Sequence, residues 1–215
     1  QMEETDYAVV ELSSFQLMDM THSPHVAVVT NLAPNHLDKH LSMAEYEQSK
    51  KNIYLHQSAS DLVVLNADNA LTKAMASEAK GKVRLFSRKE KLDDGCWTDG
   101  ESVFLGSEEL FKVSDVLLPG VHNLENYMAA CPAARGIVTP EQMRNVARTF
   151  KGVEHRMELV RTVNGVDFYN DSIASSPTRT QAGLACFDKG IVLIAGGYDK
   201  KIPFDEFGVH LCEKV

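Results

Sequence analysis

The sequence predicts an α/β fold with a largely parallel sheet and flanking helices, and three observations support this prediction. Short β-branched runs recur at residues 7–10, 26–30, 62–66, 83–86 and 102–105, and helical patterns lie between several of them. The run at 26–29 is apolar at every position, which is typical of a strand buried on both faces. Strands that alternate with helices predict a layered α/β domain.

Two helix beginnings and one irregular region are marked in the first two thirds of the chain. Ser42 is followed three residues later by Glu45, and Thr139 by Gln142, both of which are capping-box patterns. Pro140 would take the first helical position of the second helix, which its fixed φ favours. Residues 87–116 contain turn signals between short strands, so we expect a small antiparallel excursion from the main sheet there.

A domain boundary is expected at residue 152, where a glycine suits the end of the helix that begins at Thr139. The predicted domains are therefore 1–152 and 153–215. In the second domain, Asn164-Gly165 between two β runs predicts a hairpin over residues 157–169. A helix over 177–186 and an apolar strand over 191–195 should follow. Ligands gather at the carboxyl ends of such strands in open α/β sheets.

Composition excludes several classes of protein. The net charge of −8 over 215 residues argues against a dedicated nucleic-acid binder, which would carry a basic stripe. No apolar run approaches the ~20 residues of a membrane-spanning helix, and the acidic first residues are unlike a secretory leader. The four cysteines are scattered without a C-x-x-C pair, which fits a reducing compartment. We expect a cytoplasmic protein without nucleic-acid partners or membrane insertion.

Two side chains follow predicted strands closely. Glu11 comes directly after the run 7–10, and a carboxylate there can hold Mg²⁺ beside a triphosphate because Mg²⁺ prefers oxygen ligands. The alternative for Glu11 is a solvated strand-end glutamate. His36 lies in the loop after the strand 26–30, where a histidine is commonly a surface residue or a hydrogen-bonding partner.

Lys50 shares one face of the predicted helix with Tyr46, Ile53 and Tyr54. A lysine on a partly apolar face should have a lowered pKa. A neutral amine can react with CO₂ to form a carbamate, which turns a cation into an anionic oxygen ligand. The alternative is a lysine whose stem packs on the protein while its head stays in water.

Asn123 and Asn126 are separated by three positions at the start of another predicted helix, so they share a face. Their amides can offer both a donor and an acceptor to a purine edge. Asn123 can equally act as a helix cap, and the two roles are compatible.

Several motifs, in this order, resemble the Mur ligases of bacterial cell-wall synthesis. They are Glu-Leu-Ser-Ser-Phe-Gln-Leu at 11–17, Leu-Pro-Gly-Val-His-Asn at 118–123, His-Arg at 155–156, Tyr-Asn-Asp-Ser at 169–172 and Ala-Gly-Gly-Tyr-Asp-Lys at 195–200. The resemblance covers nearly the whole chain and is strongest to the D-glutamate-adding branch. It implies a truncated P-loop-type ATPase domain over 1–152 and a partial Rossmann-like, amino-acid-binding domain over 153–215.

The resemblance also implies a role for each candidate residue. Glu11, His36 and a carbamylated Lys50 correspond to the family's magnesium ligands, and Lys50 fits that motif better than Lys51. Asn123 and Asn126 resemble the pair that contacts adenine. Arg156 would pair with the γ-phosphate and Asp171 with the ribose hydroxyls. Ser13, Ser175 and Lys200 fall on the substrate side, with Lys200 placed for a carboxylate of D-glutamate.

The sequence departs from the family pattern in three ways. Asn35 stands where an aspartate is common, and Ile173 where several relatives carry a lysine. No G-x-x-x-x-G-K-[ST] motif occurs, whereas in the family this phosphate-binding loop precedes the segment of Glu11. We therefore expect that the chain lacks the UDP-binding domain and the phosphate-binding loop, and that it is inactive alone.

The predicted parent is an ATP-dependent ligase that joins D-glutamate to UDP-N-acetylmuramoyl-L-alanine through an acyl phosphate, in peptidoglycan synthesis. Its expected partners are these small molecules, ATP and Mg²⁺, and the full-length form is expected to be a monomer. One alternative is another ligase of the superfamily, such as a folylpolyglutamate synthetase or a different Mur ligase. The other is a non-catalytic nucleotide-binding or interaction module, which the missing phosphate-binding loop favours for this chain alone.

Overall fold

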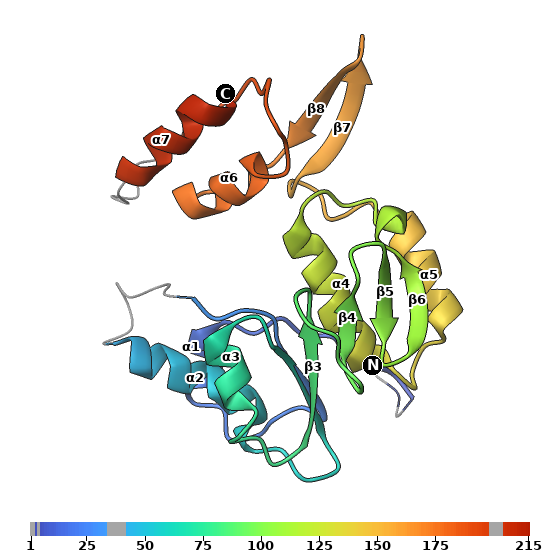
Figure 1. Cartoon of the computed structure of the whole chain (residues 1–215). Helices are drawn as coiled ribbons and strands as arrows, with labels where there is room; N and C mark the ends of the chain where they lie inside the picture. The colour runs from blue at the N-terminus through green and yellow to red at the C-terminus, as the bar shows by residue number, and fades with distance from the viewer. Residues whose placement is uncertain (1–2, 4, 34–41, 198–203) are drawn as a thin grey trace. The chain divides into compact units, whose positions relative to one another are not determined.

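The computed structural model describes residues 3, 5–33, 42–197 and 204–215 (Figure 1). Its main sheet has the strand order β1-β2-β3-β4-β5-β6. Neighbours from β1 to β4 pair in parallel, and β4 pairs antiparallel with β5. The predicted α/β fold with a largely parallel sheet and a small antiparallel excursion is therefore confirmed. The strands are β1 Val26–Val29, β2 Leu62–Asn66, β3 Lys82–Ser87, β4 Cys96–Thr98, β5 Ser102–Leu105 and β6 Glu108–Lys112.

The helices among the described residues include the two that the capping patterns predicted. They are α1 Ser14–Met18, α2 Met43–Leu55, α3 Ala70–Met75, the 3₁₀ turn Val113–Asp115, α4 Val121–Ala134, α5 Pro140–Thr149, α6 Pro177–Leu184 and α7 Asp205–Lys214. No helix in this described part is long and apolar enough to cross a membrane.

The chain divides into two compact units, Gln1–Glu109 with Met128–Ile137, and Leu110–Tyr127 with Val138–Val215. Each unit is described separately below. The domain boundary expected at residue 152 stays a prediction.

The core of the first unit lies between the parallel strands and two helices. Ala27 pairs with Val63 and Val29 with Leu65, so these side chains point to one face of the sheet. On that face they cluster with buried residues of α2 and α3, among them Tyr54 and Met75. Since the sheet period is two, the intervening Val64 points to the opposite face, and it is also fully buried. Burial on both faces explains the continuous apolar runs of the sequence.

The helix caps follow the predicted chemistry. The Ser42 hydroxyl accepts from the Glu45 N–H at the start of α2. At α5 the full capping box forms, because the Thr139 hydroxyl accepts from the Gln142 N–H and the Gln142 side chain accepts from the Thr139 N–H.

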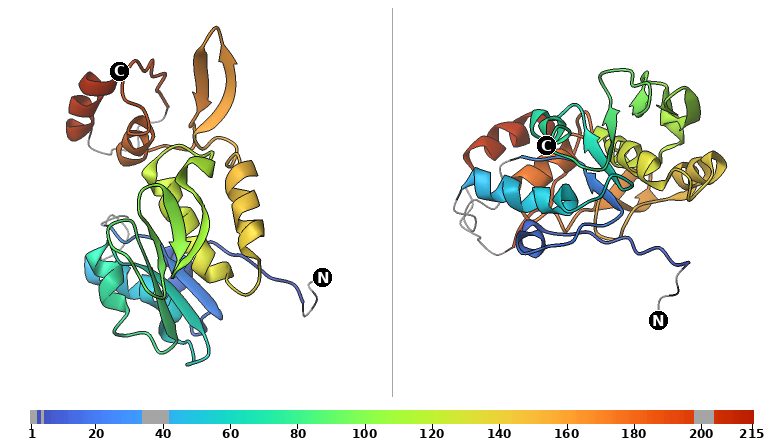
Figure 2. Two further views of the ribbon diagram at one scale, coloured as in Figure 1. Left: turned by 45° about the vertical axis from the view of Figure 1, so that its right-hand side comes forward. Right: turned by 90° about the horizontal axis from the view of Figure 1, so that it is seen from below.

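In the second unit, β7 Glu158–Val163 and β8 Val166–Asn170 form the predicted hairpin, visible as a separate two-stranded ribbon (Figure 2). Asn164 and Gly165 have φ values of 52° and 79°. Two consecutive left-handed residues are what a two-residue hairpin turn requires, and asparagine and glycine tolerate them best.

Two predicted strands are absent and must be corrected. Residues 7–10 and 191–195 have no ladder partner within the described residues. Val9, Val192 and Ile194 are 100%, 89% and 96% exposed, although β-branched residues favour half-buried pleated surfaces. β propensity marks where a strand is possible, but a strand forms only where a neighbouring backbone supplies its hydrogen bonds. Consequently Glu11 does not lie at a strand end, nor does Gly196-Gly197.

Candidate functional site

Glu11 and Lys50 are brought close together in the first unit. The short helix α1 packs on α2, and the Lys50 ammonium donates to the backbone oxygen of Leu12 at 3.4 Å. The Asn52 amide, half a turn further along α2, donates to the carbonyl oxygens of Leu17 and Met18 at 2.9 and 3.1 Å. These three hydrogen bonds hold the segment of Glu11 against α2, with Glu11 itself exposed.

Lys50 has the electrostatic setting that the sequence predicted. Its half-buried position lowers the pKa of the ammonium through loss of hydration, and the Glu11 carboxylate opposes this effect in part. The adjacent Lys51 behaves in the opposite way, because hydrogen bonds to Glu78 and then Glu47 raise its pKa. Lys50 is therefore the better placed of the two lysines to exist as a neutral amine.

Ser13 has a structural task that the sequence interpretation missed. Its hydroxyl accepts from the Gln16 N–H at 3.3 Å, and the Gln16 side chain accepts from the Ser13 N–H at 2.9 Å. Ser-Ser-Phe-Gln at 13–16 is thus a capping box, the same signal that was used at Ser42 and Thr139. The substrate contact predicted for Ser13 remains a prediction.

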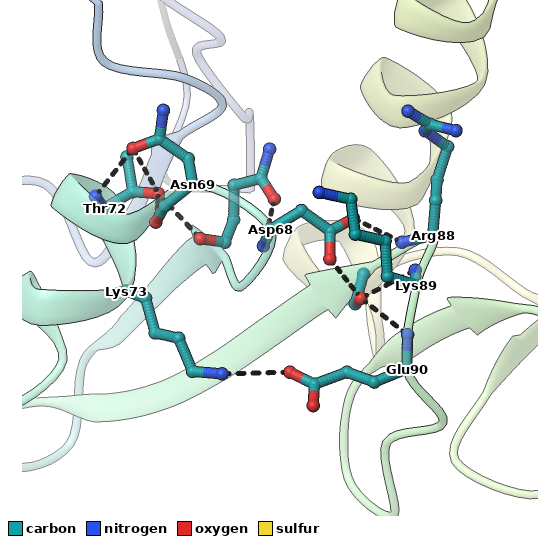
Figure 3. Close-up of polar contacts among 9 residues, drawn as sticks. Asp68, Asn69, Thr72, Lys73, Arg88, Lys89 and Glu90 are labelled. Atoms are coloured by element: carbon teal, nitrogen blue, oxygen red, sulfur yellow. Dashed lines mark hydrogen bonds and ion pairs between the residues drawn. The ribbon is translucent and has the colours of Figure 1, made fainter.

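A polar network links the carboxyl ends of β1 and β2. The Asn69 amide donates to the Asn31 side-chain oxygen at 2.7 Å and to the Leu32 backbone oxygen at 2.9 Å. The Asn69 side-chain oxygen accepts from the N–H of Thr72 at the start of α3 (Figure 3). One asparagine therefore caps a helix and anchors the backbone that follows β1.

A second part of this network links β2 to β3. The Asp68 carboxylate accepts from the Ser87 hydroxyl at 2.5 Å and from the Arg88 N–H at 2.7 Å (Figure 3). Ser87 in turn accepts from the N–H groups of Lys89 and Glu90. These residues were not predicted as site residues, although Ala-Asp-Asn at 67–69 directly follows a buried strand in the sequence.

In the second unit, Asn123 and Asn126 lie in the first turns of α4, as predicted. The Asn123 amide donates to the Pro119 backbone oxygen at 2.7 Å, so this side chain secures the turn before the helix. Asn126 is exposed. Asn123 is the third residue of α4 and its amide donates to a carbonyl, so the helix cap expected at Asn123 is wrong, because an N-cap side chain precedes the helix and accepts from its N–H groups. The adenine contact of the pair remains a prediction.

Arg156 is presented on an unusual piece of backbone. Its side chain is exposed, and its neighbours His155 and Met157 have φ values of 65° and 46°. Non-glycine residues in the left-handed region cost about 1–3 kcal/mol each when tertiary contacts must hold them there. Such strain gathers at sites that bind ligands, which fits the role predicted for Arg156.

Asp171 is joined to this strained segment. Its Oδ1 accepts from the Met157 N–H at 3.1 Å. A Cβ at Gly183 would come within 2.9 Å of Asp171 Oδ2 and 3.1 Å of the Met157 sulfur, so α6 approaches the carboxylate closely only because residue 183 is glycine. The structure thus connects the loops of Arg156 and Asp171, and their shared task on ATP remains a prediction.

Ser175, His36 and Lys200 are the remaining predicted site residues. Ser175 is exposed in the loop before α6, where its N–H donates to the Ile173 backbone oxygen at 2.9 Å. His36, Asn35 and Lys200 lie outside the described residues, so the predictions for them are unchanged. The described residues contain no group of three His, Cys, Asp or Glu side chains that could hold a metal ion. Among the described residues, Glu11 is the carboxylate whose charge acts on Lys50.

Comparison with known proteins identifies the family. A family model described as the Mur ligase middle domain matches residues 1–134. The chain belongs to the Mur ligase family. It is 59% identical over 200 residues to a UDP-N-acetylmuramoylalanine–D-glutamate ligase of Clostridium kluyveri, covering 93% of this chain and 44% of the relative. It is 57% identical over 219 residues to the ligase of the same name from Acetivibrio thermocellus, covering 100% of this chain and 47% of the relative. The chain thus spans less than half the length of these Mur ligases.

Solved structures agree with the fold. MurF from Acinetobacter baumannii superposes with a TM-score of 0.61 at 19% identity, over 76% of this chain and 37% of that one. The UDP-N-acetylmuramate-alanine ligase MurC from Thermotoga maritima gives a TM-score of 0.61 at 19% identity, over 81% and 40%. At this identity the likeness supports the Mur ligase fold alone.

Proposed function

We propose that this chain works within an ATP-dependent ligase that joins D-glutamate to UDP-N-acetylmuramoyl-L-alanine during peptidoglycan synthesis. The proposal rests chiefly on the relatives, which are 48–59% identical and carry the D-glutamate ligase name. The linked loops of Arg156 and Asp171 support it. We place this activity in the cytoplasm of a dividing cell, with the complete enzyme acting as a monomer.

The proposed reaction has three steps. A carboxylate oxygen of the L-alanine residue attacks the γ-phosphorus of ATP, and ADP leaves with the bridging oxygen. The D-glutamate amine attacks the carbonyl carbon of the acyl phosphate to form a tetrahedral intermediate. Inorganic phosphate then leaves, the amine proton is released and the amide remains.

Arg156 acts on the first step in this proposal. Its guanidinium offers forked donors that match the oxygens of a transferring phosphoryl group and stabilise the charge spread over them. Asp171 accepts from the ribose hydroxyls, and Asn123 and Asn126 hold the adenine edge. Ser175, Ser13 and Lys200 serve the amino-acid and UDP-sugar substrates.

Glu11 fits a magnesium site by its chemistry, because it is an exposed carboxylate and Mg²⁺ prefers oxygen ligands while keeping several waters. A carbamate on Lys50 would add two oxygens beside it, and His36 would complete the set. Bound there, Mg²⁺ supplies charge neutralisation for the phosphates.

The test is phosphate release by the complete ligase with ATP, Mg²⁺ and UDP-N-acetylmuramoyl-L-alanine, with and without D-glutamate. Release that requires D-glutamate supports the proposal, and we expect none from the 215-residue chain alone. Release driven by another amino acid would move the enzyme elsewhere in the superfamily. No release with any acceptor would leave only a nucleotide-binding module.

A pair of arginine variants sharpens this test. Arg156→Lys keeps the charge but loses the fork, and we expect kcat to fall about 10²-fold. Arg161→Lys in the hairpin that follows Arg156 is the matched control, since Arg161 lies over the Phe168 ring at 5.6 Å and has no predicted role. Equal losses for the two variants would contradict the assignment of Arg156.

A further inference from the structure

His155 makes more contacts with the Asp171 loop than its exposed position suggests. Its backbone oxygen accepts from the Ile173 N–H at 3.2 Å. Its ring nitrogen Nδ1 lies 2.9 Å from the Asn170 amide nitrogen. Its own N–H donates to the Glu158 carboxylate at 2.8 Å. His155 therefore joins the beginning of β7 to the segment that follows β8.

The chemistry of the contact with Asn170 fixes its direction. An amide nitrogen can only donate, so Nδ1 of His155 is the acceptor of this bond. Asn170 is half-buried, and its side-chain oxygen accepts from the Ser172 N–H at 3.1 Å. The Asn170 side chain is thus fixed by two hydrogen bonds, one to the His155 ring and one from the loop that carries Asp171.

These contacts lie on both sides of Arg156. On one side His155 is held by Asn170 and Ile173, and on the other Met157 is held by Asp171. Both neighbours of the arginine have left-handed backbone, which relaxes unless outside contacts maintain it. The backbone of Arg156 is therefore clamped to the Asp171 loop at two points, one residue before and one residue after.

We propose that His155 and Asn170 are positioning residues that fix Arg156 relative to Asp171, so that both engage one ATP molecule together. This inference rests on the proposed function. Neither residue needs to touch ATP. Their effect passes through the backbone of Arg156, and it should disappear when the Arg156 side chain is absent.

A double-mutant cycle on the complete ligase tests this dependence. Asn170→Ala should raise the Kd for ATP, measured by calorimetry without the UDP-sugar or D-glutamate, about tenfold. The same substitution in an Arg156→Ala background should change the Kd less than about twofold. Thr162→Ala is the matched control: it removes a 2.6 Å bond to Asp167 in the same hairpin and should leave the Kd unchanged.

Other outcomes separate this inference from the proposed function. Equal changes in both backgrounds would show that Asn170 supports the fold only and would overturn the inference. If Asn170→Ala does not fold, His155→Asn takes its place in the cycle, because asparagine tolerates the left-handed backbone while losing the ring. Failure of D-glutamate to drive phosphate release would reject the proposed ligase, and the ATP cycle would still decide the role of His155 and Asn170. A ligase that binds no ATP would overturn both.

Discussion

The ammonium of Lys50 donates to the backbone oxygen of Leu12 at 3.4 Å, directly after the exposed carboxylate of Glu11. Burial lowers the pKa of Lys50, whereas hydrogen bonds to Glu78 raise that of Lys51. Two consecutive lysines on one helix therefore differ in the property that decides whether an amine reacts with CO₂.

This difference predicts selective carbamylation. With ¹³C-labelled bicarbonate, the complete ligase should show a carbamate signal in its ¹³C spectrum that Lys50→Ala removes and Lys51→Ala keeps. Activity should follow the same order, with loss for Lys50→Ala and little change for Lys51→Ala. A signal that survives Lys50→Ala would contradict the assignment, as would a fully active Lys50→Ala enzyme.

The two asparagines of α4 should separate stability from binding. Asn123→Ala should lower the free energy of unfolding by about 1 kcal/mol, because it removes the bond to Pro119. Asn126→Ala should leave stability unchanged within about 0.5 kcal/mol, since Asn126 is exposed. Both should weaken ATP binding about tenfold. Urea midpoints and calorimetric titration of ATP measure the two effects, and normal ATP affinity in Asn126→Ala would remove the adenine assignment.

The hydrogen bonds of Asp61 predict that the free energy of unfolding falls in acid. The bond from His25 at 2.6 Å, together with two donors from Ser58, lowers the pKa of this carboxyl to about 2. The folded pKa lies below the unfolded value near 4, so the stabilisation is complete above about pH 5 and is lost as the pH falls toward 2.

The measurement for Asp61 is the urea midpoint between pH 6 and pH 3. The native chain should lose stability across this range more steeply than Asp61→Asn, which cannot titrate there. Parallel curves for the two proteins would show that the contacts of Asp61 do not contribute to the pH dependence.

Tyr54 tests how much a buried hydroxyl group costs the stability of the core. Its side chain is fully buried, and its hydroxyl finds no partner within the described part of the chain. An unsatisfied buried hydroxyl costs free energy, so Tyr54→Phe should raise the free energy of unfolding by about 1 kcal/mol. Chemical denaturation measures this change. A loss of stability would reveal a partner for the hydroxyl.

Local chemistry predicted much of this structure. Caps at Ser42 and Thr139, the Asn164-Gly165 turn and the apolar runs at 26–29 and 62–66 all act through neighbouring residues, and each appears where expected. The two failures, at 7–10 and 191–195, concern strands that need a distant backbone as partner, which periodicity does not reveal.

The candidate site likewise combines features set by neighbouring residues, which were predicted, with contacts between distant segments, which were not. Lys50 was predicted because helical spacing places it beside Tyr46 and Tyr54, and its lowered pKa follows from that local pattern. The contacts of His155 and Asp68 were not predicted, because they join segments 15 to 20 residues apart through loop geometry. Ser13 was assigned to substrate although the capping signal was already present in its own four residues.

The exposed run at 191–195 has a practical consequence for anyone who prepares this chain. Ile-Val-Leu-Ile-Ala combines high β propensity with no charge and no proline, and Val192 and Ile194 are almost completely open to solvent. Such a segment pairs readily with its own copies in concentrated solution. Leu193→Lys would place a charge in the middle of this run and act as a gatekeeper against precipitation.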